Sequence, residues 1–118
     1  MNSRTISNGY PNLQRELHQD FNYGVASLSF APIAIAAARA GELDLAEKHE
    51  EQCAYLANVV MRLPAWYAAH HEVRGHIAAG RGETGEALAS FTAAAARFRE
   101  AGHPIDAARC DGWVSRSE

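Results

Sequence analysis

The sequence predicts an all-α fold built from short antiparallel helices, and three observations support this prediction. Apolar residues recur at steps of three and four along most of the chain. Glycine or proline separates one such segment from the next. No stretch alternates apolar and polar residues with β-branched side chains between turn signals, as a half-buried strand would. Short connections of this kind join antiparallel neighbours, so we expect a stack of helical hairpins.

Composition limits both the size of the protein and its classes of partner. With 118 residues, 47% of them hydrophobic, the chain is long enough for one domain with a modest core. Its net charge of −3 and the absence of any lysine or arginine run argue against direct contact with nucleic acid. The longest apolar run, residues 30–38, is too short for a membrane-spanning helix, and the polar N-terminus lacks a signal-peptide core. We therefore expect a cytoplasmic protein that does not contact a membrane.

The first third of the chain contains an arm and an unusually apolar helix. Residues 1–11 are polar and predict a flexible N-terminal arm, whereas residues 12–118 form a single helical domain that opens with a short helix over 12–20. Residues 23–40 are apolar nearly all round, which indicates a helix packed on more than one side. Pro32 predicts either a kink in that helix or the start of its second half.

The second predicted helix covers residues 43–62, between Gly41 and Pro64. Its apolar positions predict one buried face, formed by Ala46, Cys53, Leu56, Ala57 and Val60. Its charged and polar positions predict a solvated face, formed by Glu47, Lys48, Glu50, Glu51 and Gln52. Cys53 and Cys110 do not form a metal-binding or redox pattern, and we expect both to be free thiols in the core.

Three further helices complete the predicted stack. Residues 65–79 form the third helix, with an inner face at Trp66, Ala69, Val73 and Ile77. Residues 84–100 form the fourth, with an inner face at Ala87, Leu88, Phe91, Ala94, Ala95 and Phe98. Pro104 occupies the favoured first position of a fifth helix, which runs to about residue 115 and leaves Trp113 and Val114 partly uncovered.

A repeated turn gives the most specific signal in the chain. Gly82 and Ala87 follow Gly41 and Ala46 at one offset of 41 positions, and both glycines precede a glutamate. Residues Gly75, Ala87, Phe91 and Ala94 have the relative spacing of the tetratricopeptide repeat signature, so this segment resembles a tetratricopeptide-like hairpin. The resemblance implies a right-handed stack of antiparallel hairpins with about two and a half repeats.

The long period and the closing phrase FREAGHPIDAARC are similar to the repeat arrays of LuxR-type ATPase transcriptional regulators. The chain carries neither a GxxxxGK[ST] phosphate loop nor a basic recognition helix. The resemblance therefore implies a non-catalytic, regulatory protein–protein interaction module. The alternative is a structural fragment of a larger regulator array, whose role is packing and signal relay.

Candidate catalytic and metal-binding patterns are weak, so we expect no enzyme activity, metal or cofactor. In HHEVRGH, His71 and His76 are separated by about 140° on a helix, whereas two zinc ligands on one helix need a spacing of three or four residues. These histidines are predicted to face solvent or a groove. His49 and Cys53 have the right spacing but lack a third ligand, and Ser90 lacks a glycine elbow. A small enzyme or metal protein remains the least favoured alternative.

The tetratricopeptide resemblance implies a concave surface lined by the first helix of each hairpin. Transferred to this sequence, its groove positions are Leu28, Ala31, Ile35, Arg39, Ala69, Glu72, His76, Ala79, Cys110 and Trp113. These residues are more apolar than charged, which suits an amphipathic helix or peptide from a partner protein. The alternatives are that the N-terminal arm covers the groove, or that a second copy of the chain does so in a homodimer.

Overall fold

The computed structural model describes the chain from Tyr23 to Glu118, with side chains described from Phe30 onward. This part contains α3 (Tyr23–Arg39), α4 (Leu43–Tyr55), the π-helical segment η1 (Leu56–Met61), α5 (Pro64–Gly80), α6 (Thr84–Glu100) and α7 (Pro104–Ser117). Within residues 23–118 there is no strand, which confirms the all-α prediction. The arm predicted at 1–11 and the helix predicted at 12–20 lie outside the described residues.

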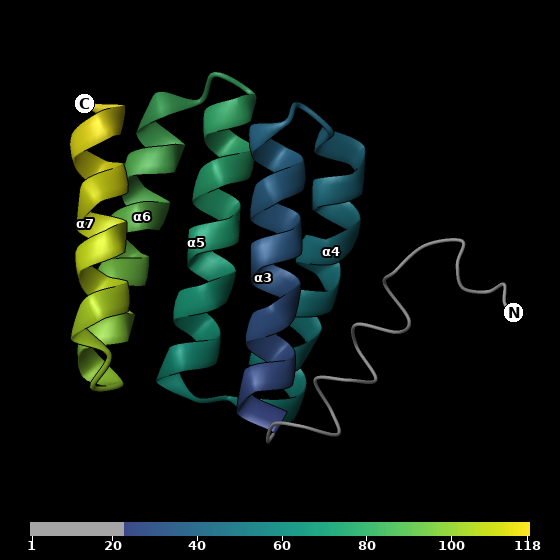
Figure 1. Ribbon diagram of the computed structural model, residues 1–118, viewed down its shortest axis with the longest axis vertical. Helices are drawn as coiled ribbons and strands as arrows, with labels where there is room; N and C mark the ends of the chain where they lie inside the picture. The colour runs from purple at the N-terminus through teal and green to yellow at the C-terminus, as the bar shows by residue number, and fades with distance from the viewer. Residues whose placement is uncertain (1–22) are drawn as a thin grey trace, which may run out of the picture.

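Successive helices run antiparallel, and α5 lies at the centre of the arrangement (Figure 1). It packs against α3, α4 and α6, while α7 packs against α6 at the C-terminal edge. Consequently α3, α5 and α7 run in the same direction, and their C-terminal ends lie at the same end of the molecule. None of the described helices is long and apolar enough to cross a bilayer.

Three turns share one backbone conformation. Gly41, Gly82 and Gly102 follow α3, α5 and α6 with φ of 84°, 77° and 81°. In the first turn the Glu42 amide donates to the Ala37 carbonyl at 2.9 Å, and equivalent bonds close the other two. This is the Schellman arrangement, in which a left-handed glycine ends the helix. The repeated Gly-Glu pairs of the sequence are therefore two copies of one hairpin turn.

Helix α3 is a single helix with Pro32 inside it, so the structure keeps the segment in one piece. Pro32 is exposed, which places its ring away from the packed side of the helix. The packed side consists of alanines, which allow close approach of the neighbouring helices: Ala31, Ala34, Ala37 and Ala38 are all buried.

The contact between α5 and α6 depends on Gly75. A Cβ atom built on Gly75 would lie 2.5 Å from Cε1 of Phe91, closer than real Cβ atoms approach. Phe91 is only 1% exposed, so its ring fills the space that the glycine leaves open. The predicted inner faces of both helices are otherwise confirmed, except that Leu88 is only half-buried.

The prediction of the second helix, over residues 43–62, is wrong at the C-terminal end of that segment. A π-helical segment replaces its last turns, and Arg62 follows in the left-handed conformation with φ of 56°. Each π turn holds more residues than an α turn, so the side chains rotate out of the predicted register. Val60, expected in the core, is 50% exposed, whereas Ala57 remains buried. Tyr55, Val59 and Leu63 are also about half exposed.

Candidate functional site

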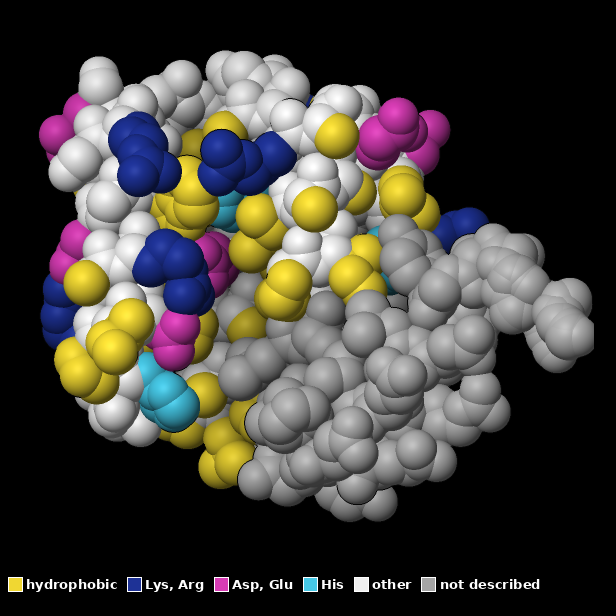
Figure 2. All heavy atoms as spheres, in the orientation of Figure 1, with side chains coloured by type: hydrophobic (Ala, Val, Ile, Leu, Met, Phe, Trp, Pro, Cys, Tyr) yellow, Lys and Arg dark blue, Asp and Glu magenta, His cyan; other side chains and the backbone are white. Residues whose placement is uncertain are grey.

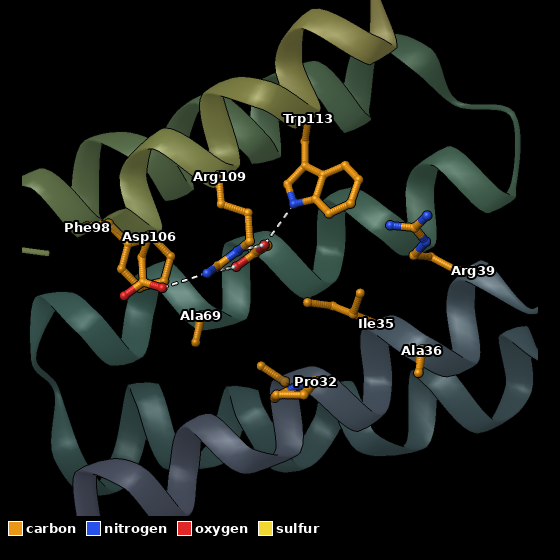
Figure 3. A pocket seen from close by; sticks show the side chains of 11 residues that line it. Pro32, Ile35, Ala36, Arg39, Ala69, Phe98, Asp106, Arg109 and Trp113 are labelled. Atoms are coloured by element: carbon orange, nitrogen blue, oxygen red, sulfur yellow. Dashed lines mark hydrogen bonds and ion pairs between the residues drawn. The ribbon is translucent and has the colours of Figure 1, made fainter. Parts of the chain in front are cut away.

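An open groove lies between α3 and α7, with α5 as its floor. Its volume is about 600 Å³. Side chains from α3 and α7 face each other across it, and Phe98 of α6 lies at one end (Figure 3). The lining residues are Ala31, Pro32, Ile35, Ala36, Arg39, Ala69, Glu72, Phe98, Asp106, Arg109 and Trp113. Figure 2 shows this face, where hydrophobic side chains between α7 and α3 lie beside both basic and acidic side chains.

A buried ion pair on the groove floor joins α7 to α5. The side chain of Glu72 is 3% exposed. Its two oxygens accept 2.8 Å hydrogen bonds from Nε and Nη2 of Arg109, and Oε2 also accepts a 2.9 Å bond from the Trp113 indole. The hydrogen bond with Glu72 is the main reason that the pKa of Arg109 lies above its usual value. Three donors therefore satisfy a carboxylate that would be costly to bury alone.

Trp113 is half-buried and forms the boundary between groove and core. On its inner side the His76 ring packs edge-on against the indole, with a centroid distance of 4.4 Å. The guanidinium groups of Arg39 and Arg116 lie 4.9 and 4.7 Å from its ring centroid. Cation–π contacts of this length are favourable, so one indole interacts with cations from both α3 and α7.

His76 belongs to the core, which corrects the prediction that it faces solvent or the groove. It is 6% exposed and lies between the rings of Phe91 and Trp113. Its Nε2 atom is buried and has no hydrogen-bond partner among the described residues. Burial is the main cause of a pKa lowered to about 4, and the nearby Arg39 and Arg109 act in the same direction, against Glu72.

The lowered pKa of His76 predicts a loss of stability in mild acid. The unfolded chain takes up the proton near the ordinary pKa of 6.5, whereas the folded chain resists it down to about 4. The contribution of His76 to the free energy of unfolding is therefore fully present above pH 6.5. It decreases by about 2–3 kcal/mol as the pH falls to 4. His71, whose pKa is also lowered, adds a smaller effect in the same direction.

Urea titrations between pH 7 and pH 4 would measure this loss. We expect His76→Phe to reduce the dependence of stability on pH across this window, because it keeps a flat ring and removes the proton site. The matched control is Val59→Ala, which changes an exposed side chain without a titratable group and should leave the dependence unchanged. An unaltered pH profile in His76→Phe would contradict the assignment.

The structure brings together only part of the predicted groove. Among the predicted positions, Ala31, Ile35, Arg39, Ala69, Glu72 and Trp113 line it. Cys110 does not, because it is fully buried in the cluster between α6 and α7. Ala79 is exposed outside the lining. The backbone of Leu28 belongs to α3, but its side chain lies outside the described part.

Sequence reasoning missed Asp106 and Arg109, together with Pro32, Ala36 and Phe98. On α7 the groove face consists of Asp106, Arg109 and Trp113, at steps of three and four. Cys110 comes one residue after Arg109, so it points about 100° away, toward α6. The signal that identifies Arg109 is its spacing of four residues from Trp113, on a helix whose buried positions are Ala107 and Cys110.

Two cysteines and a glutamate–histidine pair lie outside the groove in the described part of the chain. Cys53 and Cys110 are buried free thiols, and burial raises the pKa of each to about 12. Among the residues that the structure describes, no group of three histidine, cysteine or acidic side chains could hold a metal ion. Glu50, predicted on the solvated face, is half-buried and lies 2.9 Å from His70 Nε2; this hydrogen bond is the main cause of its lowered pKa.

Comparison of the sequence and structure with known proteins identifies no related protein. No protein-family model, curated protein or solved structure matches the chain. The described residues form a compact set of five packed α-helices. The comparisons assign no family to this fold.

Proposed function

We propose that this chain is a non-catalytic binding module that holds an amphipathic helix of a partner protein in the groove between α3 and α7. The observation that supports this proposal is the open groove itself. Its volume is about 600 Å³, which leaves room for apolar side chains from one face of a docked helix. Apolar and alanine side chains form most of its walls, and the polar groups are confined to a few positions.

The spacing of the lining residues favours a helix as the occupant. Along α3 the lining side chains recur at Ala31, Ile35 and Arg39, one helical turn apart. Such a row forms a ridge that fits the groove between side-chain rows of another helix. The ridge is about 12 Å long, which corresponds to two or three apolar anchors on the partner at helical spacing.

The charges at the Arg39 end of the groove favour an acidic group on the partner. The carboxylates of Glu72 and Asp106 are both occupied by Arg109. Two arginines and two acids line the groove, so its lining is neutral overall. Arg39 has no carboxylate partner among the described residues, which leaves an unpaired positive charge at its end of the groove. Complementary charge directs the choice of partner and speeds association more than it adds affinity.

The same proposal includes a tetratricopeptide-like, right-handed stacking of the hairpins. Two features support it: the identical Schellman turns after Gly41 and Gly82, and the contact between Gly75 and Phe91 at the helix crossing. In a stack of this kind α3, α5 and α7 are the first helices of successive repeats, and they line one face. The groove lies on that face.

Designed peptides test the groove directly. The probe is a helical peptide of about 14 residues with leucines at i, i+3, i+4 and i+7 and glutamates on the other face. We expect the wild-type protein to bind it with a Kd below about 100 μM, and Ile35→Glu to weaken binding at least tenfold, or about 1.4 kcal/mol. Isothermal titration calorimetry measures both values.

The matched control is Ile105→Glu, which adds the same charge at an isoleucine that is 83% exposed and outside the groove. We expect this variant to bind like wild type. Equal binding by Ile35→Glu, or no binding by wild type near 1 mM, would contradict the proposal. Light scattering provides a second check, because a stable dimer that Ile35→Glu dissociates would identify a second copy of the chain as the occupant.

A further inference from the structure

We infer that Arg39, Arg116 and Trp113 form an acidic-residue site at one end of this groove, where glutamate or aspartate side chains in the first turn of the partner helix bind. The inference rests on the proposed function and adds two features to it. It names the chemical group that is recognised, and it gives the direction in which the partner helix lies.

Two arginines from different helices converge on one indole. Arg39 ends α3 and Arg116 lies in the last turn of α7, yet both guanidinium groups are within 5 Å of the Trp113 ring centroid, at 4.9 and 4.7 Å. Contact with the same ring brings two like charges into one region of the surface. A carboxylate beside either guanidinium would offset this repulsion and accept a charge-assisted hydrogen bond.

Neither arginine has such an anion within the part of the chain that the structure describes. Among the described residues, no carboxylate lies within ion-pair distance of Arg39 or Arg116. Arg62, which follows η1, is the one other described arginine without a carboxylate partner. The remaining described arginines are each paired with a carboxylate: Arg74, Arg81, Arg97, Arg99 and Arg109.

Helix-dipole effects alone do not account for this arrangement. A cation in the last turn of a helix is stabilised by about 0.3–1 kcal/mol, which explains an arginine at each C-terminus. It does not explain why both side chains lie against Trp113, which also lines the groove. Guanidinium groups held on an aromatic ring are already ordered, so less entropy is lost when they bind a carboxylate.

The position of the site also sets the direction of the partner helix. Acidic residues are favoured in the first turn of a helix, where the dipole is positive. Because Arg39 and Arg116 lie at the C-terminal ends of α3 and α7, the partner would begin there and run antiparallel to both. A carboxylate at the opposite end of the groove would instead meet Asp106, near the start of α7.

Three matched peptides test this inference in a Trp66→Phe background, where Trp113 is the remaining tryptophan and reports on the site. Each peptide has about 14 residues and the same leucine row, with two glutamates in the first turn, two glutamines there, or the two glutamates moved to the last turn. We expect wild type to bind the first peptide at least tenfold more tightly than the other two. Tryptophan fluorescence and calorimetry measure the ratio.

The comparison with arginine variants separates recognition from peptide helicity, because glutamate also stabilises the free peptide. We expect Arg39→Gln/Arg116→Gln to remove the preference while still binding the glutamine peptide, and Arg39→Lys/Arg116→Lys to retain part of it. Salt at 0.5 M should reduce the preference in wild type. Circular dichroism confirms that each variant is folded.

The outcomes distinguish this inference from the proposed function. If the preference ratio is the same in wild type and in the double glutamine variant, Arg39 and Arg116 do not select carboxylates, although the groove still binds helices. If the last-turn peptide binds more tightly than the first-turn peptide, the direction is reversed and the inference fails. If no peptide binds near 1 mM, both the inference and the proposed function fail.

Discussion

Replacement of Phe91 by alanine is expected to lower the free energy of unfolding by about 3–5 kcal/mol. Phe91 is 1% exposed, and its ring packs on the backbone of α5 at Gly75, edge-on to His76 and stacked near Trp113. Helix α5 cannot move closer to fill the space without disturbing its contacts with α3 and α4, so most of the cavity would remain. Urea denaturation followed by circular dichroism measures the change.

The control for this prediction is Ile105→Ala, which removes a large apolar side chain that is 83% exposed and should change stability by less than about 0.5 kcal/mol. A second variant tests the contact itself. Gly75→Ala should destabilise the wild type, because the added Cβ would overlap the Phe91 ring, but it should be neutral or stabilising in Phe91→Ala. Strictly additive effects would contradict the close approach of Phe91 to Gly75.

The sequence predicts the fold well wherever a local rule determines the structure. Left-handed glycines end the helices at Gly41, Gly82 and Gly102, and the boundaries of α6 are as predicted. Such ends depend on residues that are adjacent in the chain. The π segment η1 is different, because nothing in the local apolar pattern distinguishes a π turn from an α turn, and the exposure of Val60 follows from it.

The groove was less predictable because its lining depends on the rotation of each helix about its own axis. One residue corresponds to about 100°, so a register taken from a family pattern is wrong by a whole face when it shifts by one position. On α7 the transferred pattern placed Trp113 correctly, but it selected Cys110 where the neighbouring Arg109 faces the groove. On α5 the register was right, but Trp113 covers His76, which is a tertiary contact between residues far apart in the chain.

Replacement of Arg109 by methionine should destabilise the protein by about 3 kcal/mol, even though the arginine itself is 44% exposed. The cost comes from its partner. Glu72 is 3% exposed and would keep only the hydrogen bond from Trp113, so a buried carboxylate would lose its countercharge and two donors. The matched control is Arg99→Met, which breaks an ion pair whose side chains are both more than half exposed and should cost less than about 1 kcal/mol.

A double-mutant cycle distinguishes this explanation from a simple loss of packing by the arginine stem. Glu72→Met/Arg109→Met replaces both charges with apolar side chains, and buried pairs replaced in this way are often neutral or stabilising. We therefore expect the double variant to be more stable than Arg109→Met alone, with a coupling energy of at least about 1.5 kcal/mol from urea denaturation. If the two single effects simply add, the pair does not stabilise the fold as a unit. In that case α7 would be held against the rest of the domain mainly by its apolar contacts with α6, around Ala107 and Cys110.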